Sequence, residues 1–187
     1  SEMCIRDSPT PDPQSWSEPI RPLRNIARGY PKNVPADIRK VQAGLPANDW
    51  RKNNLRGPAT AAPVIEDHLL VDGARTDLAI EDLRRLGKKK SPFFLAMGYI
   101  RPHLAWIAPK KYWDLHDPDK LSVMTGGKVT PNTPPYALSN SYEMTHYMDQ
   151  INFPKPWDKR RVIKAQARHL MHGYYACVSY VDAQIGR

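Results

Sequence analysis

A short, fully apolar run near the middle of the chain constrains the fold most. Phe93–Met97 follows Pro92 and ends at Gly98. The run is too short for a membrane span and has no helical periodicity, so it predicts a strand covered on both faces, as in a parallel sheet between helices. Burying each of its larger side chains would stabilise the fold by about 1.5–3 kcal/mol.

Polar side chains follow this run at once. Tyr99 comes first, and Arg101 and His103 then flank Pro102. In open α/β sheets, ligands bind at the carboxyl ends of the strands. The sequence therefore places a cation and an imidazole where such a fold has its site.

The composition adds a strong positive charge. Lys and Arg number 28 against 19 Asp and Glu, a formal net charge of +9. This excess favours an anionic partner, whether nucleic acid, acidic lipid or a sulfated or phosphorylated small molecule, although for the charge alone a solvated basic surface is the preferred explanation. The chain has no Gly-rich phosphate loop, no Ser-centred nucleophile elbow, no apolar stretch near the ~20 residues of a membrane span and no secretory signal pattern.

Two helices are predicted around the central run. Val64–Val71 is expected to be extended and to close at the turn signal Asp72–Gly73, after which Thr76 or Asp77 caps a helix that stops at Gly87. A second, long helix is expected over 159–187. Its apolar stripe, with the spacing of a core-facing side, consists of Ile163, Ala167, Leu170, Tyr174, Cys177, Val178, Val181 and Ile185.

The amino-terminal third shows no sustained period. With 19 prolines the chain has about twice the usual ~5%, and residues 9–63 are expected to form loops over the site, with short helical turns near Ala36–Val41; disorder is the alternative. Residues 1–8 resemble translated sequencing-adapter read-through. The predicted organisation is therefore 1–8 non-native, 9–63 loop-rich, and 64–187 a partial α/β core truncated at both ends.

Metal sites are not supported by residue spacing. His169 and His172 lie three apart but have no third ligand with clear spacing, so an accidental pair is the better interpretation. The series Asp114, Asp117, Asp119 lacks the central Gly and late Glu of a calcium loop. Cys177 is expected to be a small buried side chain.

Three motifs in order resemble the middle of type I sulfatases, in the branch that contains iduronate sulfatase. They are Ser91–Tyr99, Arg101–Leu104 and Ala108–Tyr112, and Gly173–Arg187 is close to a helix common in that branch. The resemblance covers 64–113 and 159–187 well and the loops poorly. It implies an alkaline-phosphatase-like α/β fold, with a parallel-rich sheet flanked by helices and long Pro-rich loops.

The resemblance also implies a chemistry. The family hydrolyses sulfate esters through a formylglycine, made from a Cys/Ser-x-Pro-x-Arg motif, beside a calcium ion, and a sulfated sugar or other small sulfated ester is the implied partner, in the periplasm or outside the cell. Cys4 is followed by Ile-Arg-Asp, and the paired aspartates that hold calcium are not found. The sequence therefore looks like an internal fragment whose nucleophile and metal ligands lie elsewhere.

One residue carries over directly. His103 matches the histidine of the family's Lys-Pro-His motif, which contacts the sulfate and assists the leaving oxygen, so it is the implied catalytic residue. Arg101 stands for the lysine and keeps the charge for substrate binding. Trp106 departs from the family pattern and is a candidate to stack on a sugar ring.

Two other functions stay open. An upstream Thr or Ser in a metal site, without the formylglycine motif, would indicate a non-sulfatase hydrolase of the alkaline phosphatase superfamily. The charge of +9 alone would suit a basic polyanion-binding module. Since no known nucleic-acid motif is present, a nucleic-acid partner ranks last. The sequence leaves the oligomeric state open.

Overall fold

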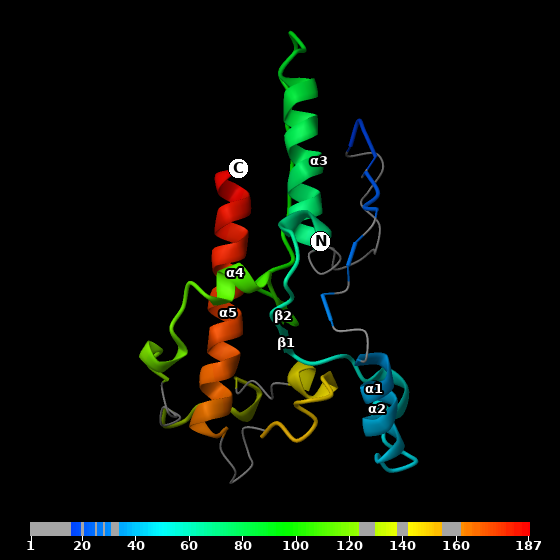
Figure 1. Ribbon diagram of the computed structural model, residues 1–187, viewed down its shortest axis with the longest axis vertical. Coiled ribbons are helices and arrows are strands. Elements are labelled where there is room, and N and C mark those ends of the chain that lie inside the picture. Colours follow the sequence, from blue (N-terminus) through cyan, green and yellow to red (C-terminus); the bar gives the residue numbers. More distant parts are fainter. Residues whose placement is uncertain are drawn as a thin grey trace.

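Two long helices and a short parallel sheet form the centre of the computed structural model. It describes residues 16–19, 21–24, 26–27, 29–30, 34–123, 130–137, 142–154 and 162–187. Helices α3 (Val71–Leu86) and α5 (Lys164–Gly186) run along the long axis, and the strands β1 (Thr60–Ala61) and β2 (Trp106–Ile107) lie beside α5, below the first turn of α3 in the view of Figure 1. Helix α4 (Lys110–Trp113) follows β2 and packs on α5.

The remaining elements are short. They are the helices α1 (Val34–Ala43) and α2 (Arg51–Asn54) and the 3-10 turns η2 (Asp67–Leu69), η3 (Pro118–Lys120), η4 (Pro135–Ala137) and η5 (Tyr142–His146). Helix α1 confirms the helical turns expected near Ala36–Val41. Residues 1–15, with Cys4 and the predicted adapter-derived octet, lie outside the described residues.

The sheet is parallel, with Thr60 opposite Trp106 and Ala61 opposite Ile107. The Trp106 amide donates to Ala59 O at 2.8 Å and the Ala108 amide to Ala61 O at 3.3 Å. Strand β1 lies inside the segment that the sequence assigns to loops, and it joins the core through this pairing. The sequence predicted a parallel sheet with Phe93–Met97 as a central strand, whereas the strands of the observed sheet are β1 and β2.

Helix α5 covers the sheet closely because it has a glycine at the crossing. A Cβ built at Gly173 would stand 3.0 Å from Thr60 Cγ2, 3.0 Å from the Trp113 ring and 3.2 Å from Trp106 Cβ. The core around this crossing is formed by Ala59, Leu70, Ala105, Ile107, Ala108, Tyr112, Trp113, Met144, Tyr147, Leu170, Ala176, Cys177 and Tyr180.

The predicted core face of α5 is wrong in part. Leu170 and Cys177 are buried as expected, but Tyr174, Val178 and Ile185 are exposed. The buried positions are Leu170, Gly173, Ala176, Cys177, Tyr180 and Gln184. Small residues on this face allow the close approach to the sheet, and Tyr180 and Gln184 reach the polar network around Asp67. A hydrophobic pattern in the sequence reveals neither the close approach through small residues nor the burial of polar side chains.

Helix α3 begins earlier than expected. Residues 72–73 lie in its first turn instead of forming a turn before it, and η2 stands where an extended segment was predicted. Gly73 makes this possible, because its backbone lies against Asp67 O and its amide donates to the Tyr180 hydroxyl at 2.7 Å. The Asp-Gly pair here permits a close approach between elements.

The prediction of an interior strand at Phe93–Met97 is wrong for this structure. These residues belong to neither strand, and Phe93 and Phe94 are 45% and 82% exposed. The chain turns beyond α3 and returns beside that helix (Figure 1), with the Tyr99 hydroxyl 3.3 Å from Thr76 Oγ1. An interior strand pairs with another strand along each edge, and in the described part of the chain the sheet contains β1 and β2 alone.

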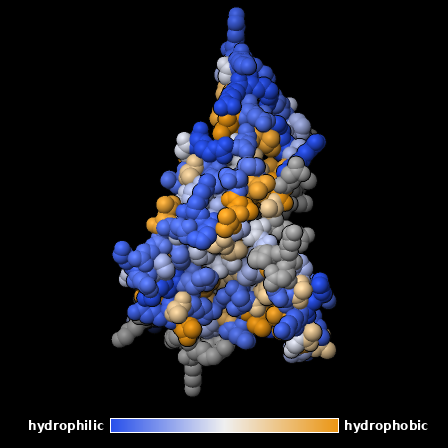
Figure 2. Space-filling view, in the orientation of Figure 1, coloured by the Kyte–Doolittle hydropathy of each residue, from blue (hydrophilic) through white to orange (hydrophobic). Residues whose placement is uncertain are grey.

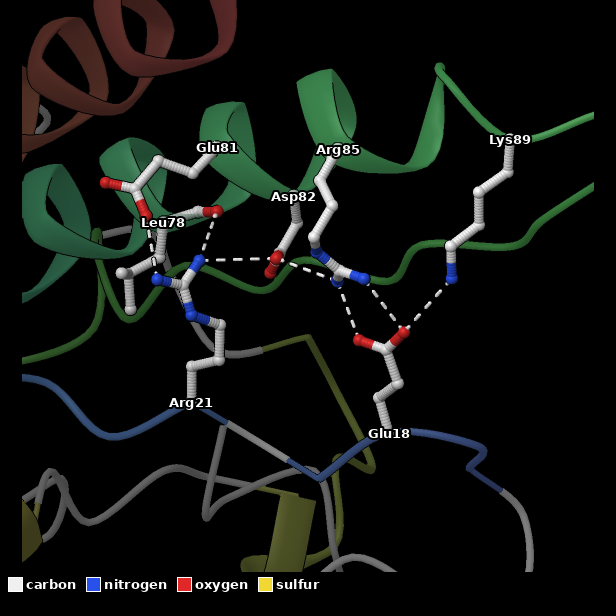
Figure 3. Close-up of polar contacts among 7 residues, drawn as sticks. All are labelled: Glu18, Arg21, Leu78, Glu81, Asp82, Arg85 and Lys89. Carbon is white, nitrogen blue, oxygen red and sulfur yellow. Dashed lines mark hydrogen bonds and ion pairs between the residues drawn. The ribbon is translucent and has the colours of Figure 1, made fainter.

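Exposed ion pairs tie an amino-terminal segment to α3. Arg21 pairs with Glu81 at 2.7 Å and with Asp82 at 3.2 Å, and Glu18 pairs with Arg85 at 2.6 Å (Figure 3). Exposed pairs of this kind contribute about 0–1 kcal/mol each. They guide where the segment lies along the helix but contribute little to its stability.

The visible surface carries both hydrophilic and hydrophobic residues. In the view of Figure 2, hydrophobic residues form separate patches among hydrophilic ones. Among the helices that the structure describes, none has the length and apolarity to cross a bilayer.

Replacing Gly73 with Ala should destabilise the protein by about 3 kcal/mol or more, since the new Cβ would meet backbone that cannot rotate away. The position of that Cβ is 2.0 Å from Asp67 O. Chemical denaturation measures the loss. Gly98→Ala is the matched control, because a Cβ there meets nothing within 4 Å; equal stability of the two variants would contradict the packing of α3 on η2.

Cys177 should be inert while the protein is folded. Burial raises the pKa of its thiol to about 12, so the thiolate fraction at pH 8 is roughly 10³-fold below that of a free cysteine. In a Cys4→Ser variant, a chromogenic disulfide reagent should label Cys177 only after guanidinium is added. Rapid labelling under native conditions would show that α5 does not pack as described.

Candidate active site

The loop that follows the apolar run is fixed by a buried carboxylate. Asp72, in the first turn of α3, accepts the amides of Ile100 at 2.7 Å and Arg101 at 3.0 Å, and it is 2% exposed. The first turn of a helix favours a negative charge. At the other end, the loop enters β2 at Trp106. Residues 100–107 are therefore held at both ends by the core.

His103 is the predicted catalytic residue, and both of its ring nitrogens have partners. Nδ1 lies 2.7 Å from Leu104 O, and since a carbonyl oxygen only accepts, Nδ1 carries the hydrogen. Nε2 lies 3.3 Å from Glu143 Oε2. With the hydrogen on Nδ1, a neutral ring presents a lone pair to the Glu143 carboxylate, so Nε2 donates to Glu143 only when the ring is protonated.

Arg101 and Trp106 are anchored to backbone within the same loop. Arg101 Nε donates to Ile107 O at 3.1 Å, and Trp106 Nε1 donates to Pro102 O at 2.8 Å. The Trp106 ring meets Tyr174 edge to face, with centroids 6.0 Å apart. Arg101 and His103 thus lie in the loop before β2 and Trp106 begins that strand, while His103 pairs with a carboxylate from another segment.

Two residues that the sequence analysis missed complete the neighbourhood of His103. Arg56 Nη1 lies 3.0 Å from Glu143 Oε1, although the two residues are 87 positions apart. A backbone bridge joins Arg56 to the residue after η5: the Arg56 amide donates to His146 O at 2.7 Å, and the Met148 amide donates to Arg56 O at 3.2 Å. No local spacing links these residues, so only the tertiary contact reveals them.

Tyrosines line the inner side of this cluster. Burial raises the pKa of Tyr30 to about 12, and its hydroxyl donates to Pro58 O at 3.0 Å. Burial likewise raises the pKa of Tyr147, against the opposing effect of Arg56. A hydrogen bond to Tyr147 raises the pKa of Arg56 above its usual value. Arg56 is therefore a permanent cation beside His103.

The other polar residues considered for metal binding have structural partners. His172 Nε2 donates to Trp113 O at 2.8 Å, and His169 bonds Thr60 at 2.8 Å. Asp117 accepts the Asp119 amide and caps η3. Within the described ranges, no group of three or more His, Cys, Asp or Glu residues is arranged to hold a metal ion.

A pocket of about 640 Å³ lies elsewhere, between the amino-terminal segment and the start of α3. Arg21, Arg24, His68 and Asp77 are among the residues that line it. Arg101, His103 and Trp106 do not contribute to its walls. The candidate site is therefore the open cluster around His103 and not this pocket.

Comparison with known proteins shows sulfatase relatives. The chain is 31% identical to iduronate 2-sulfatase of Homo sapiens over 136 residues, which cover 72% of the chain and 24% of that protein. It is 28% identical to a sulfatase of Formosa agariphila over 80% of the chain and 25% of that protein, and 27% identical to choline-sulfatase of Rhizobium meliloti over 74% of the chain and 26% of that protein. The chain thus spans about a quarter of the length of these relatives. No protein-family model matches it.

Changing Asp72 to Asn should loosen the loop without unfolding the protein. The variant loses the charge that strengthens two backbone hydrogen bonds, and hydrogen bonds to charged groups contribute about 1.5–3 kcal/mol. Amide hydrogen exchange at Ile100 and Arg101 should accelerate by roughly tenfold or more. Asp182→Asn, on the exposed surface of α5, is the control and should leave both exchange rates unchanged. Unchanged exchange rates in Asp72→Asn would show that the Asp72 carboxylate does not hold the loop.

Proposed function

Because the chain is a distant member of the sulfatase family, we propose that the full-length protein hydrolyses sulfate esters with the loop 100–107 in its active site. One observation carries this proposal. His103, the residue that matches the family's histidine, has its Nδ1 fixed by a backbone carbonyl and its Nε2 turned toward the carboxylate of Glu143. This is the arrangement required of a side chain that exchanges a proton with a substrate through one defined atom.

His103 acts as the general acid. Nδ1 keeps its hydrogen and donates it to Leu104 O, so Nε2 is the atom that faces the substrate. As the S–O bond to the alcohol breaks, the leaving oxygen takes the proton from Nε2 and departs as a neutral hydroxyl. Before that transfer, the imidazolium charge stabilises the negative charge that develops on the sulfate and on the leaving oxygen.

Arg101 and Arg56 supply positive charge for the sulfate group. The Nε of Arg101 is bonded to Ile107 O, so Arg101 would contact sulfate oxygens through its terminal nitrogens, in a two-pronged arrangement that suits such anions. Arg56 would contact the same group from the opposite segment. Trp106 is held beside them by Pro102 O, and we propose that it packs against the ring of a sulfated sugar.

Calcium and formylglycine do not fit the residues that the structure describes. No cluster of His, Cys, Asp or Glu in those ranges could hold a metal, and Cys177 is buried and followed by Val-Ser-Tyr, not x-Pro-x-Arg. We propose that the remainder of the full-length protein supplies the nucleophile and the metal, within an alkaline-phosphatase-like fold. The same family membership suggests a periplasmic or extracellular location.

In the full-length protein, His103→Ala should lower kcat for a sulfate ester by roughly 10²-fold or more, as expected for the loss of a general acid. Turnover of an aryl sulfate and of a sulfated sugar measures the effect. His68→Ala, an exposed histidine on η2, is the matched control and should retain full activity. Undiminished turnover in His103→Ala would remove this residue from the mechanism.

A parallel assay separates the sulfatase from a related hydrolase. Phosphate mono- and diesters of the same alcohols are offered to the full-length protein beside the sulfate esters. Cleavage of the phosphate esters alone would replace the proposed reaction with phosphoester hydrolysis.

A further inference from the structure

The carboxylate of Glu143 bridges a guanidinium and an imidazole from distant parts of the chain. Oε1 lies 3.0 Å from Arg56 Nη1, and Oε2 lies 3.3 Å from His103 Nε2. Arg56 lies just before β1, His103 lies in the loop before β2, and Glu143 belongs to η5. Arg56 and His103 therefore share one carboxylate, each contacting a different oxygen.

This anion stands where a substrate must approach. Since Nδ1 of His103 is engaged by Leu104 O, Nε2 is the ring nitrogen left for a ligand. Glu143 already faces that nitrogen. A sulfate oxygen that reaches Nε2 takes the position of the carboxylate oxygen, because both anions need the same donor.

We propose that Glu143 is a displaceable counter-ion, which holds Arg56 and His103 together while the site is empty and gives way to the sulfate group of the substrate. This inference rests on the proposed function, since it takes the incoming anion to be a sulfate. It explains how Arg56 and His103 are held in place before the anion binds. It also assigns Glu143 a role in setting affinity.

The surroundings of Glu143 suit a side chain that moves while its backbone stays. Within η5, His146 packs on Trp50 with ring centroids 4.3 Å apart, and Thr145 Oγ1 donates to Tyr142 O at 2.8 Å. The Glu143 side chain itself is 40% exposed. Rotation of the Glu143 side chain into solvent would thus break both of its ion pairs without disturbing η5.

Such an exchange weakens anion binding. The sulfate must break two partly exposed ion pairs, and since one pair of this kind changes an equilibrium by up to about fivefold, the two together change it by roughly two- to thirtyfold. Neutralising Glu143 removes this competition and leaves both cations in place. A variant with Glu143 neutralised should therefore bind sulfate more tightly, although it has lost the ion pairs of Glu143 with Arg56 and His103.

The test is a sulfate titration of the 187-residue chain, followed by NMR signals of the histidine rings. It is run at pH 6, where histidine is commonly protonated, with chloride holding the ionic strength constant. Glu143→Gln is compared with the unmodified chain and with Glu66→Gln, which makes the same charge change at an exposed residue preceding η2. Glu143→Ser provides a second variant if the first does not fold.

The proposal is supported if the Kd for sulfate is roughly two- to thirtyfold lower in Glu143→Gln, the His103 ring signals shift on binding, and the Kd of Glu66→Gln is unchanged. Unchanged or weaker binding in both Glu143 variants would overturn the proposal and show that the carboxylate only positions His103. Absence of any His103 shift with sulfate would overturn it as well.

Turnover by the full-length protein separates this inference from the proposed function. Glu143→Gln should lower KM for a sulfate ester by the same factor as the Kd. If the protein binds sulfate as predicted but cleaves no sulfate ester, the proposal that Glu143 is a displaceable counter-ion is supported and the proposed reaction is wrong.

Discussion

A buried carboxylate at the start of α3 connects the fold to the candidate site. Asp72 accepts the backbone amides of residues 100 and 101, so the loop with His103 is attached to the core by its main chain. A negative charge is tolerated there because it lies in the first turn of a helix and accepts two hydrogen bonds. The orientation of the site therefore follows from the position of α3.

That position depends in turn on a polar network around η2. Asp67 accepts hydrogen bonds from Tyr112 at 2.6 Å and from Gln184 at 2.9 Å, and its Oδ1 pairs with Lys111 at 2.8 Å. Burial raises the pKa of Asp67, but these partners outweigh it and hold the pKa below the usual value. The network joins η2, α4 and α5, and the absence of a side chain at Gly73 brings α3 against it.

The site itself combines rigid and adaptable parts. Backbone hydrogen bonds hold the loop, and side-chain bonds to carbonyls anchor Arg101 and Trp106. By contrast, the contacts among Arg56, Glu143 and His103 are partly exposed ion pairs, which solvent and salt weaken. An anionic substrate can thus replace an internal partner without rearrangement of the core.

The sequence by itself determined the features that depend on neighbouring residues. The long helix α5, the turns of α1 and the motif that contains Arg101 and His103 all follow from local spacing and residue type. Tertiary structure decided which face of α5 is buried, where α3 begins, the exposure of Phe93 and the approach of Arg56 and Glu143 to His103. These depend on contacts between segments many positions apart, and local periodicity carries no information about which distant backbone or charge will be nearby.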